Sequence, residues 1–376
     1  ADDDFFVPVA YRGAFGDVNW AETWTCLGQN GYFGDLSGGF AENIVVVSDA
    51  DLTGDAHWTA ANMYILDGFV YLENGTLTID AGTIIKGREV PTSGDNASAL
   101  IICQSAKIDA QGPSETPIIF TAEDDDIEDN ADLDHTDRGL WGGLILLGYG
   151  ELGFSTETAY VEGIPEGEER AKFGGTNNED DSGILRYISI RHGGAELSPG
   201  DEINGLTLGG VGSGTVIEHV EVFANDDDGI EWFGGAAQCK WLISAFCKDD
   251  AFDYDFGWRG KGQFWFTIQA TDESENGGEH DGAKPDDATP FSKPTIYNAT
   301  YIGSGTDAGS VQSLNSTGIL FRDAAGGTYA NSIFTSYLHE AIEVEDLAAG
   351  EGVDSRQRME DGDLNSDVFM ETVFNE

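Results

Sequence analysis

Acidic residues recur at a regular spacing in the middle of this chain. In a coiled β structure, equivalent side chains on adjacent turns lie about 4.8 Å apart, and carboxylates that close cannot all stay ionised without a cation between them. Calcium, a hard ion that takes about six to eight oxygen ligands, is the natural cation. The recurring pairs are Asp226-Asp227, Asp249-Asp250 and Asp272-Glu273, at intervals of 23 residues. The candidate calcium ligands are Asp226, Asp227, Asp228, Glu231, Asp249, Asp250, Asp253 and Asp255.

Two alternatives compete with a calcium site. The simpler is a row of solvated aspartates at turn corners, where Asp is favoured in any case. The other is hydrolysis of a glycosidic bond, in which paired carboxylates act as general acid and base. Four motifs resemble the N-x-D, D-D, R-x-K and G-H-G motifs of polygalacturonase-type glycosidases, namely Asn225-x-Asp227, Asp249-Asp250, Arg259-x-Lys261 and the segment around His280. The match is incomplete, because His280 is not flanked by two glycines and the Arg-x-Lys motif precedes it instead of following it.

An enzyme would therefore have Asp227, Asp249, Asp250, Arg259, Lys261 and His280 as its candidate catalytic residues. A polyuronate lyase is a related alternative, in which calcium holds the uronate and Lys261 or Arg259 acts as the base. Carbohydrate binding without catalysis would need exposed aromatic side chains along one face of the protein. The tryptophans that would serve, Trp232, Trp241, Trp258 and Trp265, are better explained as core or corner residues.

The elements that must position these residues are short strands in a repeat of about 23 residues. Runs rich in Val, Ile, Leu, Phe and Tyr alternate with Gly, Asn and Asp, and helical periodicity is scarce. At a shift of 23, residues 77–79 fall over 100–102, residues 219–223 over 242–246, and Phe233-Gly234 over Phe256-Gly257. Such a period is that of one turn of a parallel β-helix, in which each strand pairs with its counterpart one turn later. An antiparallel sandwich would show tight hairpin signals, which are few.

Three regions divide the chain. Residues 1–40 are aromatic and irregular, which predicts an N-terminal extension or cap. Residues 41–345 carry the repeat and predict the β-helix, with loop insertions at 123–138, 152–181 and 273–293. Residues 346–376 predict an acidic C-terminal tail. Insertions on a solenoid usually carry its specific contacts.

Composition excludes several classes of partner. The chain has 376 residues, and its 18 Lys and Arg against 69 Asp and Glu give a net charge of −51 at pH 7. Such a charge argues against nucleic acid and against anionic membrane surfaces. Hydrophobic residues make up 40 % of the chain, which argues against disorder. The longest apolar stretch, residues 139–148, has about half the roughly 20 residues of a membrane-spanning helix, so no span is expected.

The cysteines and the first residue of the chain are the evidence on its cellular compartment. Cys26, Cys103, Cys239 and Cys247 permit two disulfides, and the connectivity cannot be deduced from sequence. Cys239 and Cys247 are close in sequence and are the first choice for a bridge, while buried free thiols are the alternative. The chain starts at Ala1 and not at Met, which favours a mature secreted protein.

Several long motifs, in order, resemble a known family. They are LTIDAGTIIKG (77–87), RGLWGGLILLG (138–148), ILRYISIRHGG (184–194), EINGLTLGGVGSG (202–214), DDGIEWFGG (227–235) and DAFDYDFG (250–257). They resemble the secreted, right-handed β-helix-repeat surface proteins of Bacteroidota-related and marine bacteria. The resemblance spans roughly residues 40–340 and implies the right-handed fold and an extracellular location. It implies no particular chemistry.

The sequence therefore predicts a secreted, right-handed parallel β-helix with a structural or adhesive role at the cell surface. Calcium or high salt would rigidify it, and its partner would be a surface polysaccharide or further copies of itself in a layer or fibre. A polysaccharide-active enzyme and a carbohydrate-binding module are the alternatives.

Overall fold

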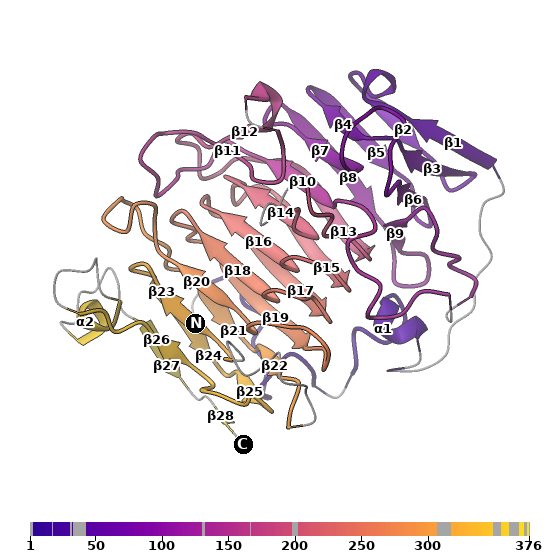
Figure 1. Ribbon diagram of the computed structural model, residues 1–376. Helices are drawn as coiled ribbons and strands as arrows, with labels where there is room; N and C mark the ends of the chain where they lie inside the picture. The colour runs from indigo at the N-terminus through magenta and orange to yellow at the C-terminus, as the bar shows by residue number, and fades with distance from the viewer. Residues whose placement is uncertain are drawn as a thin grey trace.

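Parallel strands stack turn upon turn along one axis in this protein (Figure 1). The computed structural model describes residues 3–16, 18–30, 32, 43–129, 132–165, 167–197, 202–306, 317–348, 355–360, 368–371 and 374–375. Apart from one small antiparallel pair, every described strand pairing is parallel. The predicted right-handed parallel β-helix is thereby confirmed.

A nine-stranded sheet forms one face of the coil and carries the acidic residues of interest. Its strands contain two to four residues each, so every other side chain faces the interior and the rest face outward. In order along the axis, they are β4 (Phe69–Leu72), β7 (Ala99–Ile102), β10 (Leu144–Leu147), β14 (Leu206–Gly209), β16 (Ile230–Phe233), β18 (Phe252–Asp255), β20 (Glu279–Asp281), β23 (Leu320–Arg322) and β26 (Glu343–Val344).

A 17-stranded sheet forms the other two faces, because its four longest strands each turn a corner. These strands are β13 (Gly183–Arg191), β15 (Val216–Phe223), β17 (Gln238–Ala245) and β19 (Lys261–Ile268). One face continues through β2 (Ala56–Trp58), β5 (Gly75–Ile79), β8 (Ala106–Gln111), β21 (Thr295–Tyr297), β24 (Gly327–Ala330) and β27 (Val368–Glu371). The other continues through β1 (Asn43–Val47), β3 (Asn62–Leu66), β6 (Ile84–Gly87), β9 (Ile118–Ala122), β22 (Thr300–Ile302), β25 (Ile333–Thr335) and β28 (Phe374–Asn375). The parallel pairing thus extends from residue 43 to residue 375.

Few other elements occur in the described part of the chain. The antiparallel pair β11 (Ala159–Tyr160) and β12 (Lys172–Phe173) lies in an insertion. The helices are α1 (Cys26–Gln29) and α2 (Ser355–Glu360), with two 3-10 turns at η1 (Asp49–Asp51) and η2 (Glu169–Ala171). No helix among the described residues is long and apolar enough to cross a membrane.

The corner of each long strand is made by one residue with a positive φ. Tyr187, His219, Trp241 and Phe264 have φ between 54° and 62° and stand at equivalent positions on successive turns. Their rings stack in a column, with centroid distances of 4.2, 4.5 and 5.6 Å. Left-handed backbone at these non-glycine positions is therefore stabilised by stacking along the axis.

The repeat length varies from turn to turn. Val220 pairs with Leu242, so this turn has 22 residues and not the predicted 23. Between β17 and β19 the repeat is 23, and Ala245 pairs with Ile268 as expected. The predicted pairing of Leu77 with Leu100 is wrong, because Leu77 pairs with Ile108. Loops between the strands change length without disturbing the stacking, so one fixed shift cannot align every turn.

Large aromatic side chains fill the interior of the coil. Trp232, Trp258 and Trp265 are fully buried, and the rings of Trp232 and Trp265 stack at 5.0 Å with an interplanar angle of 4°. Trp241 lies instead in the corner column. The prediction that these four tryptophans are core or corner residues is confirmed.

All four cysteines are buried and free. The predicted disulfide between Cys239 and Cys247 is therefore wrong. Cys239 lies near the start of β17 and Cys247 lies beyond its end. Eight residues of largely extended chain separate the two by a distance on the order of 20 Å, whereas a bridge needs Cα atoms within roughly 7 Å.

The N-terminal segment, residues 3–16 and 18–30, packs across the outside of the 17-stranded sheet. Ala14, Ala21 and Trp24 are completely buried there, in a cluster with apolar side chains of β15, β17 and β19. Side chains of the coil bind the backbone of the segment: Gln263 exchanges hydrogen bonds of 2.8 and 2.9 Å with Val7. The segment is thus anchored to turns far along the chain.

The buried carboxylate of Glu221 holds the start of α1. It accepts hydrogen bonds from the backbone N–H groups of Cys26 at 2.6 Å and Leu27 at 3.2 Å, and from the Ser189 hydroxyl at 2.7 Å. Burial raises the pKa of Glu221 above its ordinary value. These bonds satisfy donors that a short helix cannot satisfy itself.

Replacing Glu221 with Leu should lower the free energy of unfolding by about 2–6 kcal/mol, since the backbone N–H groups of Cys26 and Leu27 then lose their acceptor at roughly 1–3 kcal/mol each. Urea unfolding followed by tryptophan fluorescence measures the change. Glu218→Leu is the matched control, because Glu218 forms a half-exposed ion pair with Arg186 whose loss costs about 1 kcal/mol or less. Equal effects of the two substitutions would contradict this role of Glu221.

Candidate metal centre

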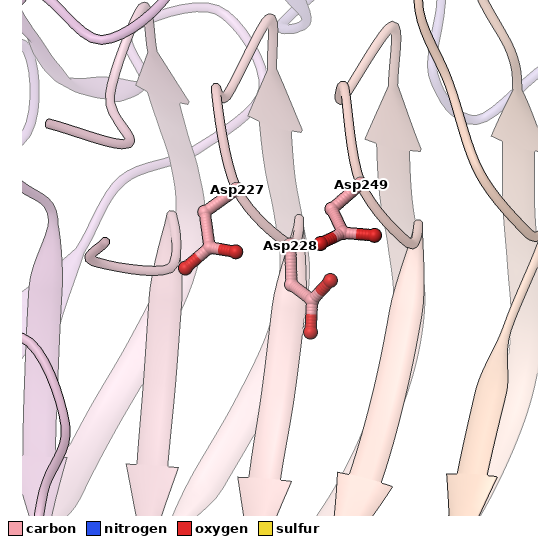
Figure 2. A group of neighbouring side chains, drawn as sticks. All are labelled: Asp227, Asp228 and Asp249. Carbon is pink, nitrogen blue, oxygen red and sulfur yellow. The ribbon is translucent and has the colours of Figure 1, made fainter. Parts of the chain in front are cut away.

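Two neighbouring turns bring carboxylates together beside the nine-stranded sheet. One turn follows β15 and supplies Asp227 and Asp228, and the next follows β17 and supplies Asp249. Their carboxylates converge (Figure 2), with one oxygen of each within 4.8 Å of the others. The backbone N–H of Asp250 donates to Asp228 Oδ1 at 2.9 Å, which ties the two turns together.

A second group of carboxylates shares Asp228 with the first. Glu231 of β16 and Asp253 of β18 are paired in register, and each has an oxygen within 4.8 Å of one on Asp228. Both project from the outer face of the sheet, because their neighbours Ile230 and Trp232 face the core. The five carboxylates Asp227, Asp228, Asp249, Glu231 and Asp253 are called the acidic cluster below.

Burial makes the acidic cluster unfavourable for ionised carboxylates. Asp228 is 7 % exposed and Glu231 is 5 % exposed. Burial, reinforced by the neighbouring carboxylates, raises the pKa of Asp228, Glu231 and Asp253 well above their ordinary values. Burial, Glu162 and Asp249 raise the pKa of Asp227 to about 8. Burial, with Glu275 and Glu202, raises the pKa of Asp249 to about 6.

Asn204 joins the acidic cluster to Glu162. Its Nδ2 donates to Glu231 Oε2 at 2.5 Å and to Glu162 Oε1 at 3.2 Å. Asn204 is 1 % exposed, and its Oδ1 has no hydrogen-bond partner. One oxygen of Asp253 is also buried without a partner. Buried polar atoms are normally satisfied, so these two atoms beside the carboxylates leave room for a bound water or cation.

The donor set suits a hard divalent cation. Carboxylate and amide oxygens are the ligands of calcium, and the cluster and Asn204 offer only oxygens and one amide nitrogen. No Lys, Arg or His among the described residues forms an ion pair with any of the five carboxylates. Lys248 and Arg322 act on Asp249 only from beyond ion-pair distance, so a cation would supply the positive charge in direct contact with the carboxylates.

Further carboxylates continue the outer face of the sheet beyond the cluster. Asp255 accepts a hydrogen bond from the backbone of Phe256, and Asp250 accepts one from Asn276 at 2.5 Å. Glu279 and Asp281 of β20 form ion pairs with Arg322 of β23 at 2.5 and 2.7 Å. An arginine thus neutralises this end of the acidic face.

Two predicted acidic positions lie outside the cluster. Asp226 forms an ion pair with Lys248 at 3.1 Å, and Asp272 binds Arg138 through two hydrogen bonds of 2.8 and 3.1 Å. The one-residue difference in repeat length brings Asp227 and Asp228 beside Asp249 and Asp250. A longer connection then brings Glu275 and Asn276, and not Asp272 and Glu273, next to Asp249 and Asp250.

The residues of the hydrolase alternative do not converge. Asp227, Asp249 and Asp250 lie together, but His280 faces the interior, is fully buried and stacks on Tyr254 at 3.8 Å. Burial lowers the pKa of His280 to about 3, and its Nε2 lies 2.7 Å from the Tyr329 hydroxyl. Lys261 pairs with Asp3 of the N-terminal segment, and Arg259 pairs with Glu151. The six residues therefore do not form the combined arrangement that the polygalacturonase-type motifs would require.

Sequence reasoning missed Glu162 and Asn204. Both lie outside the aligned repeat, Glu162 in the insertion and Asn204 just before β14. The only signal in the sequence is the acidic composition of the insertion, which names no particular residue.

The fold and the site define a right-handed parallel β-helix with a buried group of carboxylates on the outer face of one sheet. The family model of the pectate-lyase-like β-helix domain matches residues 50–373, and the chain belongs to this family. Comparisons with curated proteins and with solved structures found no match.

Proposed function

We propose that this protein is an extracellular structural or adhesive β-helix whose coil is locked by calcium at the acidic cluster. The observation that carries the proposal is the convergence of five carboxylates from two successive turns at a site without a basic partner among the described residues. Burying that many like charges is costly unless a cation offsets it. A cation there would hold adjacent turns together, as the ligands come from both.

The insertion covers part of the outer face of the nine-stranded sheet, and this favours a structural role over an enzyme that cleaves a polysaccharide. Apolar side chains of the insertion, residues 149–182, pack on the outward-facing side chains of β4, β7 and β10. A cavity of about 440 Å³ does open on the surface, but Asp55, His57, Thr76 and Thr78 line it, and they belong to the first turns of the coil. Residues of the acidic cluster do not line it.

The net charge of −51 is consistent with assembly that depends on cations. Copies of so acidic a chain repel one another, and divalent cations or high salt reduce that repulsion. Self-association into a layer or fibre, and binding of surface polysaccharide, are the partner interactions that we propose on this basis.

Calcium should raise the thermal midpoint of unfolding, and a chelator should lower it. At a free calcium concentration 100 times the Kd, binding adds about 2.7 kcal/mol to stability. Asp228→Asn should remove most of the calcium-dependent shift, because Asp228 belongs to both groups of ligands. Asp226→Asn is the matched control and should keep the shift, since Asp226 pairs with Lys248. The same midpoint with calcium and with chelator would overturn the proposal.

The family match favours a second candidate, action on acidic polysaccharides. Screening polyuronates for cleavage tests it, with Asp250→Asn as the variant that should lose activity. The positions of His280 and Lys261, away from the cluster, make this candidate the weaker one.

A further inference from the structure

The insertion between β10 and β13 is a separate layer on the outside of the coil. Its antiparallel pair, β11 and β12, lies beside β7 and β10 (Figure 1). The contact between the insertion and the coil is apolar. Leu152, Val161 and Phe173 of the insertion lie in one cluster with outward-facing side chains of β4, β7 and β10. Lining up apolar residues on both sides removes them from water and holds the layer in place.

The insertion also contributes a carboxylate to the rim of the acidic cluster. Glu162, an exposed residue next to buried Val161, shares Asn204 with Glu231 and raises the pKa of Asp227 and Glu231. The backbone is in direct contact at this point, because a Cβ on Gly163 would lie 2.6 Å from the carbonyl oxygen of Glu202. The insertion and the coil therefore meet at the acidic cluster, with carboxyl groups on both sides.

We propose that the cation bound at the acidic cluster fastens the insertion to the coil, so that cation occupancy decides whether the outer face of β4, β7 and β10 stays covered. This inference rests on the proposed calcium site and adds a regulated movement to it. The buried Asn204 is the second observation that points to a ligand, because its side chain reaches both Glu162 and Glu231 while its Oδ1 has no partner.

The physical reason is the balance between apolar contact and charge. With a cation present, Glu162 on the insertion and Glu231 on the coil are drawn to the same positive charge. Without it, Glu162 and Glu231 are joined only through hydrogen bonds, and the insertion is held down mainly by the apolar contact. The long strands β13, β15 and β17 carry no part of this contact and should keep their stability.

Hydrogen exchange of the full chain, measured by mass spectrometry with calcium and with chelator, tests the inference. The amides of Gly150, Gly153 and Gly174 tie the insertion to the coil, because they donate to the carbonyl oxygens of Gly210, Phe256 and Gly148. In chelator they should exchange about tenfold faster or more, while amides of β15 and β17 keep their protection. Glu162→Gln should weaken this dependence on calcium, since it removes the carboxylate by which the insertion would bind the cation. Glu157→Gln, an exposed residue of the same insertion, is the matched control and should behave as wild type.

The outcomes separate this inference from the proposed function. A calcium-dependent thermal midpoint with unchanged exchange in residues 149–182 overturns the fastening role and leaves the calcium site standing. Equal acceleration in the insertion and in β15 and β17 also overturns it, because calcium would then act on the whole coil. Absence of any calcium effect on the midpoint or on exchange overturns both.

Discussion

Metal-free protein should lose stability steadily as the pH rises from 7 to 8.5. Burial, together with neighbouring carboxylates, raises the pKa of Asp227 and of Asp255 to about 8. Burial likewise raises the pKa of Glu279 to about 8. In the unfolded chain these groups titrate near pH 4, so in this window the folded state binds more protons than the unfolded state. Each proton that folding must take up lowers stability by about 1.4 kcal/mol per pH unit.

Histidines and carboxyls with a lowered pKa contribute little to the slope between pH 7 and 8.5. Burial lowers the pKa of His192, His219 and His280, and this opposes the carboxylates only below about pH 6.5, where unfolded histidine titrates. Carboxyls with a lowered pKa, such as Asp67 and Asp272, stabilise the fold above their unfolded pKa near 4 and are fully ionised here. The four buried thiols have a raised pKa and titrate near pH 8.5 in the unfolded chain, so they add to the loss of stability in the upper part of the window, with calcium or without it.

Urea unfolding in chelator at pH 7, 7.75 and 8.5 measures the slope. Saturating calcium should reduce the slope by the share that the cluster contributes, because the bound cation replaces the protons there, while Asp255 and Glu279 keep theirs. Asp227→Asn should reduce the slope by about one proton, or about 1.4 kcal/mol per pH unit. Metal-free stability that is constant or rises over this window would contradict the buried acidic cluster.

Trp265→Ala should destabilise the coil by about 3–5 kcal/mol, the range observed for removal of a large buried aromatic side chain. Trp265 is fully buried, and its ring lies 5.0 Å from Trp232 and 4.8 Å from Phe252. Removing it leaves a cavity between two turns that the stacked strands cannot close without losing register. Urea denaturation with circular dichroism detection measures the loss.

Trp265→Phe is the control for this change and should cost clearly less, since the smaller ring still fills part of the cavity. Trp241→Ala offers a second comparison, because Trp241 lies half-buried in the corner column and not in the core. A Trp265→Ala variant within 1 kcal/mol of wild type would show that the interior repacks.

The fold class was predictable because inward-facing apolar residues alternate with outward-facing ones along each strand and the pattern repeats from turn to turn. Side chains such as Val220 and Val222 face the core, and the same pattern returns one turn later at Leu242 and Ser244. The register was less predictable, because a turn may have 22 or 23 residues or carry a long insertion while the strands still stack. A single residue of difference decides that Asp228 belongs to the cluster and that Asp226 pairs with Lys248 instead.

The candidate site was predictable in its chemistry and only partly in its members. Five of the eight expected ligands meet in the cluster, and Asp250 lies beside them with its backbone bonded to Asp228. Glu162 and Asn204 approach from elsewhere in the sequence, and no spacing rule connects them to the repeat. His280 looked catalytic in sequence, but strand alternation turns it into the core.

By itself, then, the sequence determined that the chain coils into parallel turns and that carboxylates gather on one side of the middle turns. Local periodicity is enough for this, because each strand needs only an apolar face and a counterpart one turn away. Only the tertiary structure decided which carboxylates meet, which of them an arginine or lysine neutralises, and that an insertion covers the sheet next to them. Those outcomes depend on loop lengths and on contacts between residues far apart in the chain, which no local pattern encodes.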